Sequence, residues 1–468
     1  MRYLSTRGEA PALGFNDVLL AGLARDGGLY LPETWPRLSE AEIAGLAGKP
    51  YAEVAYRVIH PFVDGDIDDA DLKAMIEEAY ATFDHTAVAP LVQLSPRQFV
   101  LELFHGPTLA FKDVAMQLLA RLMDHVLAER GRKATIVGAT SGDTGGAAIE
   151  AFRGRDNVDI FILFPEGRVS PVQQRQMTTV ADANVHAIAV KGNFDDCQAH
   201  LKAMFNDFAF RDRVGLSGVN SINWARIVAQ IVYYFTAGVA LGAPARKVAF
   251  SVPTGNFGDI LAGYAAMRMG LPVDKLIVAT NINDILYRAL ETGRYEVRGV
   301  VPTASPSMDI QVSSNFERLL FEAHGRDAAA ISRMMAGLSQ SGAFTIEPDA
   351  LQDISRHFAA GRTDEGETAD TIRRVRAGTG YLLDPHSAVG VSVAERLGPE
   401  DGVTVTLATA HPAKFPDAVE AASGERPALP ERLADLMERE ERFTPLANDL
   451  DTIKDFVLTH AKAVAAEA

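Results

Sequence analysis

Cysteine is nearly absent from this sequence of 468 residues, which contains only Cys197. A single cysteine excludes an internal disulfide and argues against a thiolate metal site. It suits a reducing compartment, so we expect a cytoplasmic protein. No apolar run is long enough to cross a bilayer, and no apolar signal core follows Met1. We therefore expect no association with a membrane.

Basic residues are also in short supply. The 45 lysines and arginines face 61 aspartates and glutamates, which gives a formal net charge of −16. This balance argues against general nucleic-acid binding, so no nucleic-acid partner is expected. An anionic ligand would have to be held by a few local cations and by backbone N–H groups.

Strand and helix patterns alternate from residue 99 onward, which predicts an α/β protein with mostly parallel sheets flanked by helices. The chain is too long for one core, so we expect two lobes, over residues 96–240 and 241–468 and free to interleave, after an N-terminal domain over residues 1–95. Residues 362–368 are expected to form a charged surface connection. Strands are predicted at residues 99–104, 135–138, 160–164, 185–190, 248–252, 276–280 and 403–407, and helices at 40–46, 51–59, 144–152, within 206–241, at 259–269, at 284–290 and from 416.

Lys112 stands at the start of a predicted helix. Gly106 and Pro107 end the preceding strand, Thr108 is expected to cap the helix, and apolar periodicity then continues to Val126. The helix dipole and desolvation both lower the pKa of a lysine in a first turn. A neutral amine is what a Schiff-base nucleophile needs, although a snorkelling surface lysine is the alternative.

A glycine- and hydroxyl-rich loop over residues 138–146 follows one predicted strand and opens a helix. Ligands of open α/β sheets lie beyond the carboxyl ends of the strands, and small residues let a backbone approach an anion there. Thr140, Ser141 and Thr144 add hydroxyl donors, although a tightly packed turn is the alternative. The spacing does not match a dinucleotide fingerprint, a nucleophile elbow or a phosphate loop with its lysine.

Two more strand ends carry loops of this kind. Residues 252–259 could surround a phosphate with backbone N–H groups, with Asp259 either capping the next helix or orienting the loop. Residues 407–415 place Thr409 at a strand end, where its hydroxyl can reach a cleft.

A fourth segment enters the long helix within residues 206–241. Asn220, Ser221 and Arg226 suit a second oxyanion, whereas an N-cap with a surface arginine is the alternative. His105, His386 and His411 lack metal-ligand spacing, so we expect structural roles for them and no metal site.

Together these segments resemble the threonine synthase family, which comprises pyridoxal 5'-phosphate (PLP) enzymes of the tryptophan-synthase-β-like group with fold type II. The resemblance covers nearly the whole chain in the family's order. Asp143 is similar to the longer branch of the family, whereas shorter members carry asparagine at this point, and its role stays open. The segments concerned are residues 4–8, 26–30, 105–113, 140–145, 220–226, 253–259 and 408–415.

The resemblance implies a two-lobed enzyme with PLP in the cleft, held by Lys112 as a Schiff base. Lys112 would then shuttle protons, and the reaction would convert O-phospho-L-homoserine and water to L-threonine and phosphate by γ-elimination and β-addition, the last step of threonine biosynthesis. The expected assembly is a monomer or a small homo-oligomer. The implied contacts are Gly255, Asn256, Phe257, Gly258 and Asp259 with the cofactor phosphate, Thr409 with the pyridine nitrogen, Thr140, Ser141 and Thr144 with the substrate carboxylate, and Asn220, Ser221 and Arg226 with the substrate phosphate.

Two other functions remain open. A related PLP lyase, such as a serine or threonine dehydratase, would share the lysine and the phosphate cup but would not need the anion site of residues 220–226. A doubly wound ligand-binding or regulatory protein that has lost catalysis is disfavoured by the intact Lys112.

Overall fold

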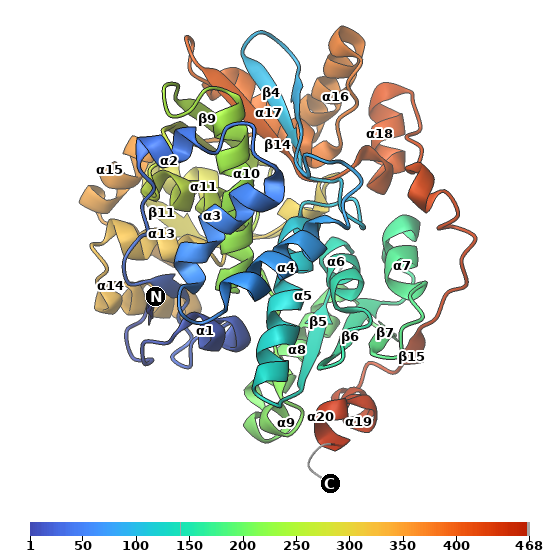
Figure 1. Ribbon diagram of the computed structural model, residues 1–468. Helices are drawn as coiled ribbons and strands as arrows, with labels where there is room; N and C mark the ends of the chain where they lie inside the picture. The colour runs from blue at the N-terminus through green and yellow to red at the C-terminus, as the bar shows by residue number, and fades with distance from the viewer. Residues whose placement is uncertain (141, 466–468) are drawn as a thin grey trace.

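A computed structural model describes residues 1–140 and 142–465, and its strands form two main sheets flanked by helices (Figure 1). The larger sheet has the strand order β13-β10-β9-β14-β4-β3, and its pairs are parallel except for β3 with β4. The mostly parallel α/β architecture predicted from the sequence is therefore confirmed. The strands of this sheet are β3 (Leu91–Gln93), β4 (Gln98–Glu102), β9 (Val248–Pro253), β10 (Val273–Thr280), β13 (Phe358–Arg362) and β14 (Val403–Ala408).

The smaller sheet is parallel throughout, in the order β15-β7-β6-β5-β8. Its central strand β6 is buried along its whole length, as expected for an apolar strand covered on both faces. Its strands are β5 (Ala134–Ala139), β6 (Val158–Pro165), β7 (Val185–Val190), β8 (Leu216–Ser217) and β15 (Thr444–Leu446), and the nearby helices are α6 (Asp143–Phe152), α7 (Pro171–Thr178), α8 (Phe194–Asn206), α9 (Phe208–Arg213), α19 (Leu450–His460) and α20 (Lys462–Ala465).

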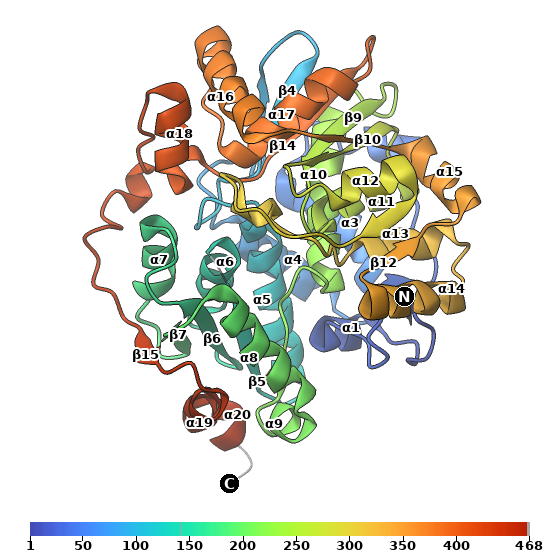
Figure 2. The ribbon, with the colours of Figure 1, turned by 180° about the vertical axis from the view of Figure 1, so that it is seen from behind.

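The two sheets interleave in sequence. Strand β4 precedes the strands of the smaller sheet along the chain but pairs in the larger sheet. Strand β15 follows the strands of the larger sheet along the chain but pairs in the smaller sheet. After α18 (Pro416–Ser423), the chain runs past α7 to reach β15, as both ribbon views show (Figures 1 and 2). The lobe boundaries near residues 95 and 240 stay predictions.

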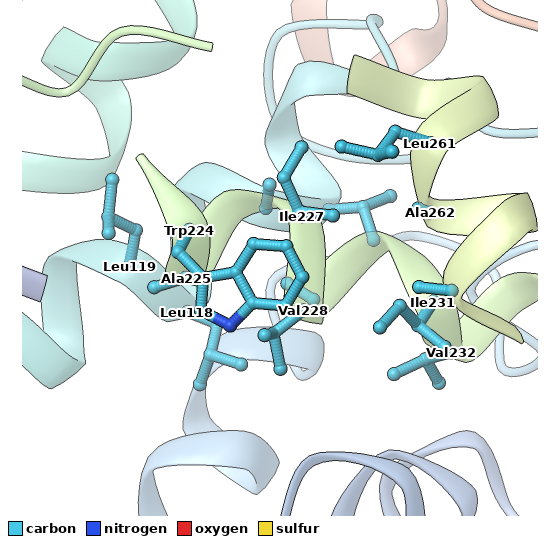
Figure 3. Close-up of a cluster of buried hydrophobic side chains, with 14 of the residues drawn as sticks. Leu118, Leu119, Trp224, Ala225, Ile227, Val228, Ile231, Val232, Leu261 and Ala262 are labelled. Atoms are coloured by element: carbon cyan, nitrogen blue, oxygen red, sulfur yellow. The ribbon is translucent and has the colours of Figure 1, made fainter. Parts of the chain in front are cut away.

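The apolar centre is formed by three helices, of which the first and the third pack against the second: α5 (Lys112–Glu129), α10 (Trp224–Ala240) and α11 (Gly258–Arg268). Figure 3 shows Leu118 of α5 beside Trp224 of α10, with Ile227 of α10 and Leu261 of α11 in the same cluster. Almost every residue of α10 is buried, since α5, α11 and α3 (Tyr51–Val63) all pack against it. This packing fixes the N-termini of α5 and α11 relative to each other.

The N-terminal region is tied to later parts of the chain by polar contacts. Thr6 and Arg7 donate to the carboxylate of Glu317, and the Asn223 amide donates to Leu19 O at 2.9 Å. No helix in the described part of the chain is both long and apolar enough to span a membrane. The region contains β1 (Tyr3–Ser5), α1 (Phe15–Ala21), β2 (Tyr30–Pro32), α2 (Glu40–Ala44), α3 and α4 (Asp69–Tyr80).

Two local predictions are wrong. Thr108 does not cap α5, because Phe111 occupies the N-cap position, and Thr108 instead donates from its backbone N–H and its hydroxyl to Asp113, at 2.8 and 2.7 Å. Residues 362–368 are not simply a connection, because a capping box of Asp364 and Glu367 starts a helix there. The remaining elements are α12 (Ile285–Thr292), β11 (Arg294–Glu296), η1 (Pro306–Met308), α13 (Phe316–Ala323), α14 (Ala328–Ser341), β12 (Ala343–Thr345), α15 (Pro348–His357), α16 (Glu365–Thr379), α17 (Pro385–Leu397), η2 (Pro412–Lys414) and η3 (Glu431–Leu433).

Candidate active site

A cavity of about 610 Å³ lies where β5, β9 and β14 end and α5, α6 and α11 begin. This is the position at which parallel α/β sheets hold their ligands. Ser141 lies outside the described residues, and all the other predicted site residues line the cavity. They are Lys112, Thr140, Thr144, Asn220, Ser221, Arg226, Gly255, Asn256, Phe257, Gly258, Asp259 and Thr409.

Lys112 is the first residue of α5, and its side chain is only 10% exposed. Its Nζ lies 3.4 Å from Asp143 Oδ2. Burial lowers the pKa of Lys112 from its ordinary value, and Arg226 and Lys414 add to this, whereas Asp143 opposes it. The surface-lysine alternative is therefore wrong, because the amine is buried at the cavity wall.

Asp143 connects Lys112 to a second lysine that the sequence analysis left without a role. Lys414 is wholly buried, and its Nζ lies 2.8 Å from Asp143 Oδ1. Gln173 also donates to Asp143 Oδ1, at 2.7 Å. Burial alone would raise the pKa of Asp143, but Lys414 and Lys112 outweigh it and hold that pKa well below its ordinary value. The cavity therefore contains a fixed carboxylate beside its lysine.

Residues 255–259 form the turn from β9 into α11. Phe257 adopts a left-handed conformation with φ of 63°, which is uncommon for a residue with a side chain. A Cβ on Gly255 would lie 2.7 Å from Ser307 O, so only glycine fits there without a shift. The backbone is thus closely packed around a helix N-terminus, where N–H groups favour an anion.

Asp259 does not cap α11, which corrects one of its two expected roles. Its carboxyl group instead accepts hydrogen bonds from the hydroxyls of Tyr233 and Tyr234 on α10. Burial raises the pKa of Asp259 to about 7, although both hydrogen bonds oppose the shift. Its Oδ2 has no hydrogen-bond partner among the described residues. A neutral carboxyl group at this point would be compatible with a neighbouring phosphate.

Arg226 is not a surface residue, because only 3% of it is exposed. Its Nη1 donates to Val219 O at 3.0 Å, while its Nε has no partner among the described residues. Burial lowers the pKa of Arg226 to about 10, and no carboxylate of the described chain forms an ion pair with it. Asn223, rather than Asn220 or Ser221, caps α10. A buried guanidinium without a counter-ion is suited to an anionic ligand.

The three threonines predicted as site residues differ in what they already bind. Thr140 Oγ1 accepts the N–H groups of Gly142 and Gly145, at 2.9 and 3.1 Å, so it shapes its own loop. Thr144 is half-buried on the first turn of α6. The Thr409 carbonyl accepts the N–H of Phe111 at 2.8 Å, which joins the end of β14 to the turn before Lys112.

One histidine of the cavity wall was missed by the sequence analysis as a site residue. His386 is buried, its Nδ1 lies 2.7 Å from Asp384 Oδ2, and its Nε2 accepts the backbone N–H of Ser307 at 3.3 Å. The Asp384 carboxylate two residues before it was the available signal. His105 and His411 do not line the cavity.

Comparisons with known proteins cover nearly the whole chain. Family models match threonine synthase N terminus over residues 2–80, pyridoxal-phosphate dependent enzyme over residues 83–409, and threonine synthase, C-terminal, over residues 387–457. The threonine synthase of Pseudomonas aeruginosa is 58% identical over 98% of both chains. The chain belongs to the threonine synthase family.

Solved threonine synthase structures share the fold. The crystal structure of a PLP-bound threonine synthase from Brucella melitensis has a TM-score of 0.98 and 65% identity, and covers 99% of this chain and 100% of its own. Yeast threonine synthase has a TM-score of 0.94 and 40% identity, and covers 100% of this chain and 99% of its own. The expected fold type II architecture and the expected membership of the threonine synthase family are confirmed, and the chain is a PLP-dependent enzyme of that family.

Proposed function

We propose that the cavity is the active site in which this threonine synthase converts O-phospho-L-homoserine and water to L-threonine and phosphate, with PLP carried by Lys112. The activity is that of its family, a carbon–oxygen lyase acting on a phosphate ester. One observation supports the location: a buried lysine, a closely packed helix N-terminus and a buried arginine without a counter-ion among the described residues line a single cavity.

The residues of the cavity fit PLP. The N-terminus of α11 offers N–H groups to the cofactor phosphate, and the close approach at Gly255 favours a backbone cradle. Asp259 is compatible with that phosphate when it is protonated, and its unpartnered Oδ2 could then donate a hydrogen bond. Thr409 supplies a neutral hydroxyl for the pyridine nitrogen. When bound, PLP supplies an electron sink for negative charge at the substrate carbons.

Lys112 is the group that moves protons in this proposal. Its lowered pKa favours the neutral amine, which can take a proton from a substrate carbon and return it to another. Thr140, Ser141 and Thr144 hold the substrate carboxylate, which the N-terminus of α6 also attracts. Holding the carboxylate fixes which carbons face Lys112 Nζ.

Arg226 binds the substrate phosphate, together with Asn220 and Ser221. Negative charge builds on the departing phosphate as the ester bond breaks. A desolvated guanidinium therefore stabilises the transition state more than it stabilises the bound substrate. In a chain of net charge −16, a buried cation without a counter-ion among the described residues supports the binding of an anionic ligand. Water then adds at Cβ to give threonine.

A dehydratase would need no such anion site, so substrate preference separates the two functions. Purified protein should release phosphate and L-threonine from O-phospho-L-homoserine far faster than it forms oxo acids from L-serine or L-threonine. The opposite preference would contradict the proposal. A colourless protein that takes up no PLP would favour a non-catalytic binding protein.

The remaining partners follow from chemistry and composition. A small phosphorylated amino acid is the proposed ligand, and the single buried cysteine suits the proposed cytoplasmic location. We expect a monomer or a small homo-oligomer, which sedimentation of the purified protein would measure.

A further inference from the structure

Asp143 lies between two lysines that come from distant parts of the chain. Lys112 starts α5 and approaches Asp143 Oδ2 to 3.4 Å, while Lys414 ends η2 and approaches Oδ1 to 2.8 Å. Gln173 of α7 donates to the same Oδ1 at 2.7 Å. The carboxylate is therefore held through Oδ1, while its Oδ2 faces Lys112 and also accepts the Ser307 hydroxyl at 3.4 Å.

Lys414 does not line the cavity and has no exposed surface, so it cannot meet a ligand there directly. Its Nζ also donates to Thr108 O at 2.6 Å and to Gln176 Oε1 at 3.0 Å. A buried ion pair is a weak source of stability compared with well-packed apolar residues. Its geometry instead restricts Asp143 to one orientation.

Other charged or titratable groups around the lysine come from several elements. Arg226 of α10 adds a cation near Lys112, and Asp113 of α5 is occupied by Thr108. Asp259 of α11 is bound by tyrosines, and His386 of α17 is paired with Asp384. Asp143 is thus the carboxylate that contacts the Lys112 amine within the described residues.

We propose that Asp143 is the counter-ion of the Lys112 amine and that Lys414 is a positioning residue that anchors this carboxylate beside it. The inference rests on the proposed function only in taking Lys112 as the cofactor-bearing lysine. Asp143 favours the protonated amine, whereas Lys414 acts on Asp143 and, as a like charge, disfavours that form. Removing Asp143 should therefore lower the pKa of Lys112, whereas removing Lys414 combines loss of the anchor with loss of a like charge, and the charge effect alone is measured where Asp143 is absent.

The test measures the reactivity of Lys112 against pH in the full-length chain after its cofactor has been removed with hydroxylamine. Trace acetic anhydride labels neutral amines, and mass spectrometry compares the Lys112 peptide with that of the exposed Lys247. In D143N the midpoint of the Lys112 profile should fall by roughly one pH unit, because a nearby anion is lost. K414M should move the midpoint to a lower pH relative to the shift that the same substitution causes in D143N, because only in the presence of Asp143 does it also release the carboxylate.

A merely structural role would lower the melting temperature of both variants and leave the midpoints in place, which would overturn the proposal. A K414M shift that is equal in the wild type and in D143N would do the same, because Lys414 would then affect Lys112 only through its charge. If the single variants do not fold, D143N/K414M removes both charges together. Asp143 affects the pKa of Lys112 more strongly than Lys414 does, so the midpoint of the double variant should lie below that of the wild type. An unchanged midpoint would overturn the proposal.

The proposed function is tested separately in the same variants. After PLP is added back, borohydride reduction and peptide mapping identify the lysine that carries the cofactor. An adduct elsewhere than on Lys112 refutes the proposed function, whereas an adduct on Lys112 with unmoved midpoints refutes only the role of Asp143 and Lys414.

Discussion

Replacing Arg226 with glutamine tests the proposed phosphate site. The side chain is 3% exposed, and in the described chain only the contact of its Nη1 with Val219 O, at 3.0 Å, uses its donors. The other donors are free for a ligand, and glutamine keeps much of the volume while it removes the charge. We therefore expect R226Q to affect the departing phosphate more than the fold.

The expected magnitude follows from a desolvated, charge-assisted contact. Losing such a donor costs about 2–4 kcal/mol of transition-state stabilisation, which corresponds to a fall of roughly 30- to 1000-fold in kcat/KM. Because the charge on the phosphate grows as the ester bond breaks, kcat should fall as well as KM rise. R226Q also leaves the Val219 carbonyl without this hydrogen-bond donor, which should lower the free energy of unfolding by about 1–3 kcal/mol.

The assay measures phosphate release from O-phospho-L-homoserine, and R121Q is the matched control. Arg121 is also buried, at 6% exposed, and pairs with Glu78 at 3.0 Å away from the cavity lining. R121Q should lower the melting temperature and leave kcat/KM nearly unchanged. Binding of L-threonine, which lacks the phosphate, should be similar in R226Q and in the wild type.

Two results would refute the reasoning. Unchanged phosphohomoserine turnover in R226Q would show that Arg226 does not bind the substrate phosphate. Loss of PLP binding in R226Q would assign the guanidinium to the cofactor instead.

Three further substitutions test other parts of the site. T409D should keep PLP bound but lower turnover at least roughly tenfold, because a carboxylate imposes the wrong protonation state on the pyridine nitrogen, and unchanged turnover would mean that Thr409 does not contact the ring. In the cofactor-free protein, the free energy of unfolding of the wild type should fall relative to that of D259N as the pH rises from about 4 to about 7. Burial raises the pKa of Asp259 from 3.8 to about 7, so the folded state retains a proton that the unfolded state releases. Urea titrations that give the same pH dependence for both proteins would contradict this. G255A should weaken PLP binding by about 1–3 kcal/mol, because its Cβ would lie 2.7 Å from Ser307 O. G378A is the control, since its Cβ would meet nothing within 4 Å. Equal PLP affinities of the two variants in a fluorescence titration would exclude the backbone cradle.

The loops of the site could be predicted because each follows a short apolar strand and opens an apolar-periodic helix. This pattern located Lys112 in the first turn of α5 and residues 255–259 at the start of α11. The carboxyl ends of parallel strands meet at one edge of a sheet, so the rule for ligand position predicted that these loops would lie together. Local periodicity and one topological rule were sufficient for that part of the site.

Long-range contacts could not be predicted in this way. Lys414 forms an ion pair with Asp143 and donates a hydrogen bond to Gln176, and no local sequence pattern encodes either contact. Asp259 was expected beside a phosphate, and the tyrosines that surround its carboxyl group come from α10. Thr108 matched a capping pattern, but it lies before the N-cap residue Phe111, and its backbone N–H and hydroxyl both donate to Asp113.

The position of the cofactor is the central claim, and borohydride reduction followed by peptide mapping tests it most directly. The reduced holoenzyme should carry the pyridoxyl group on the peptide that contains Lys112, and K112A should carry none. Lys414 lies in the same charge cluster and Lys202 lines the same cavity, so both are close competitors. An adduct on Lys414 or Lys202, or an undiminished adduct in K112A, would contradict the account.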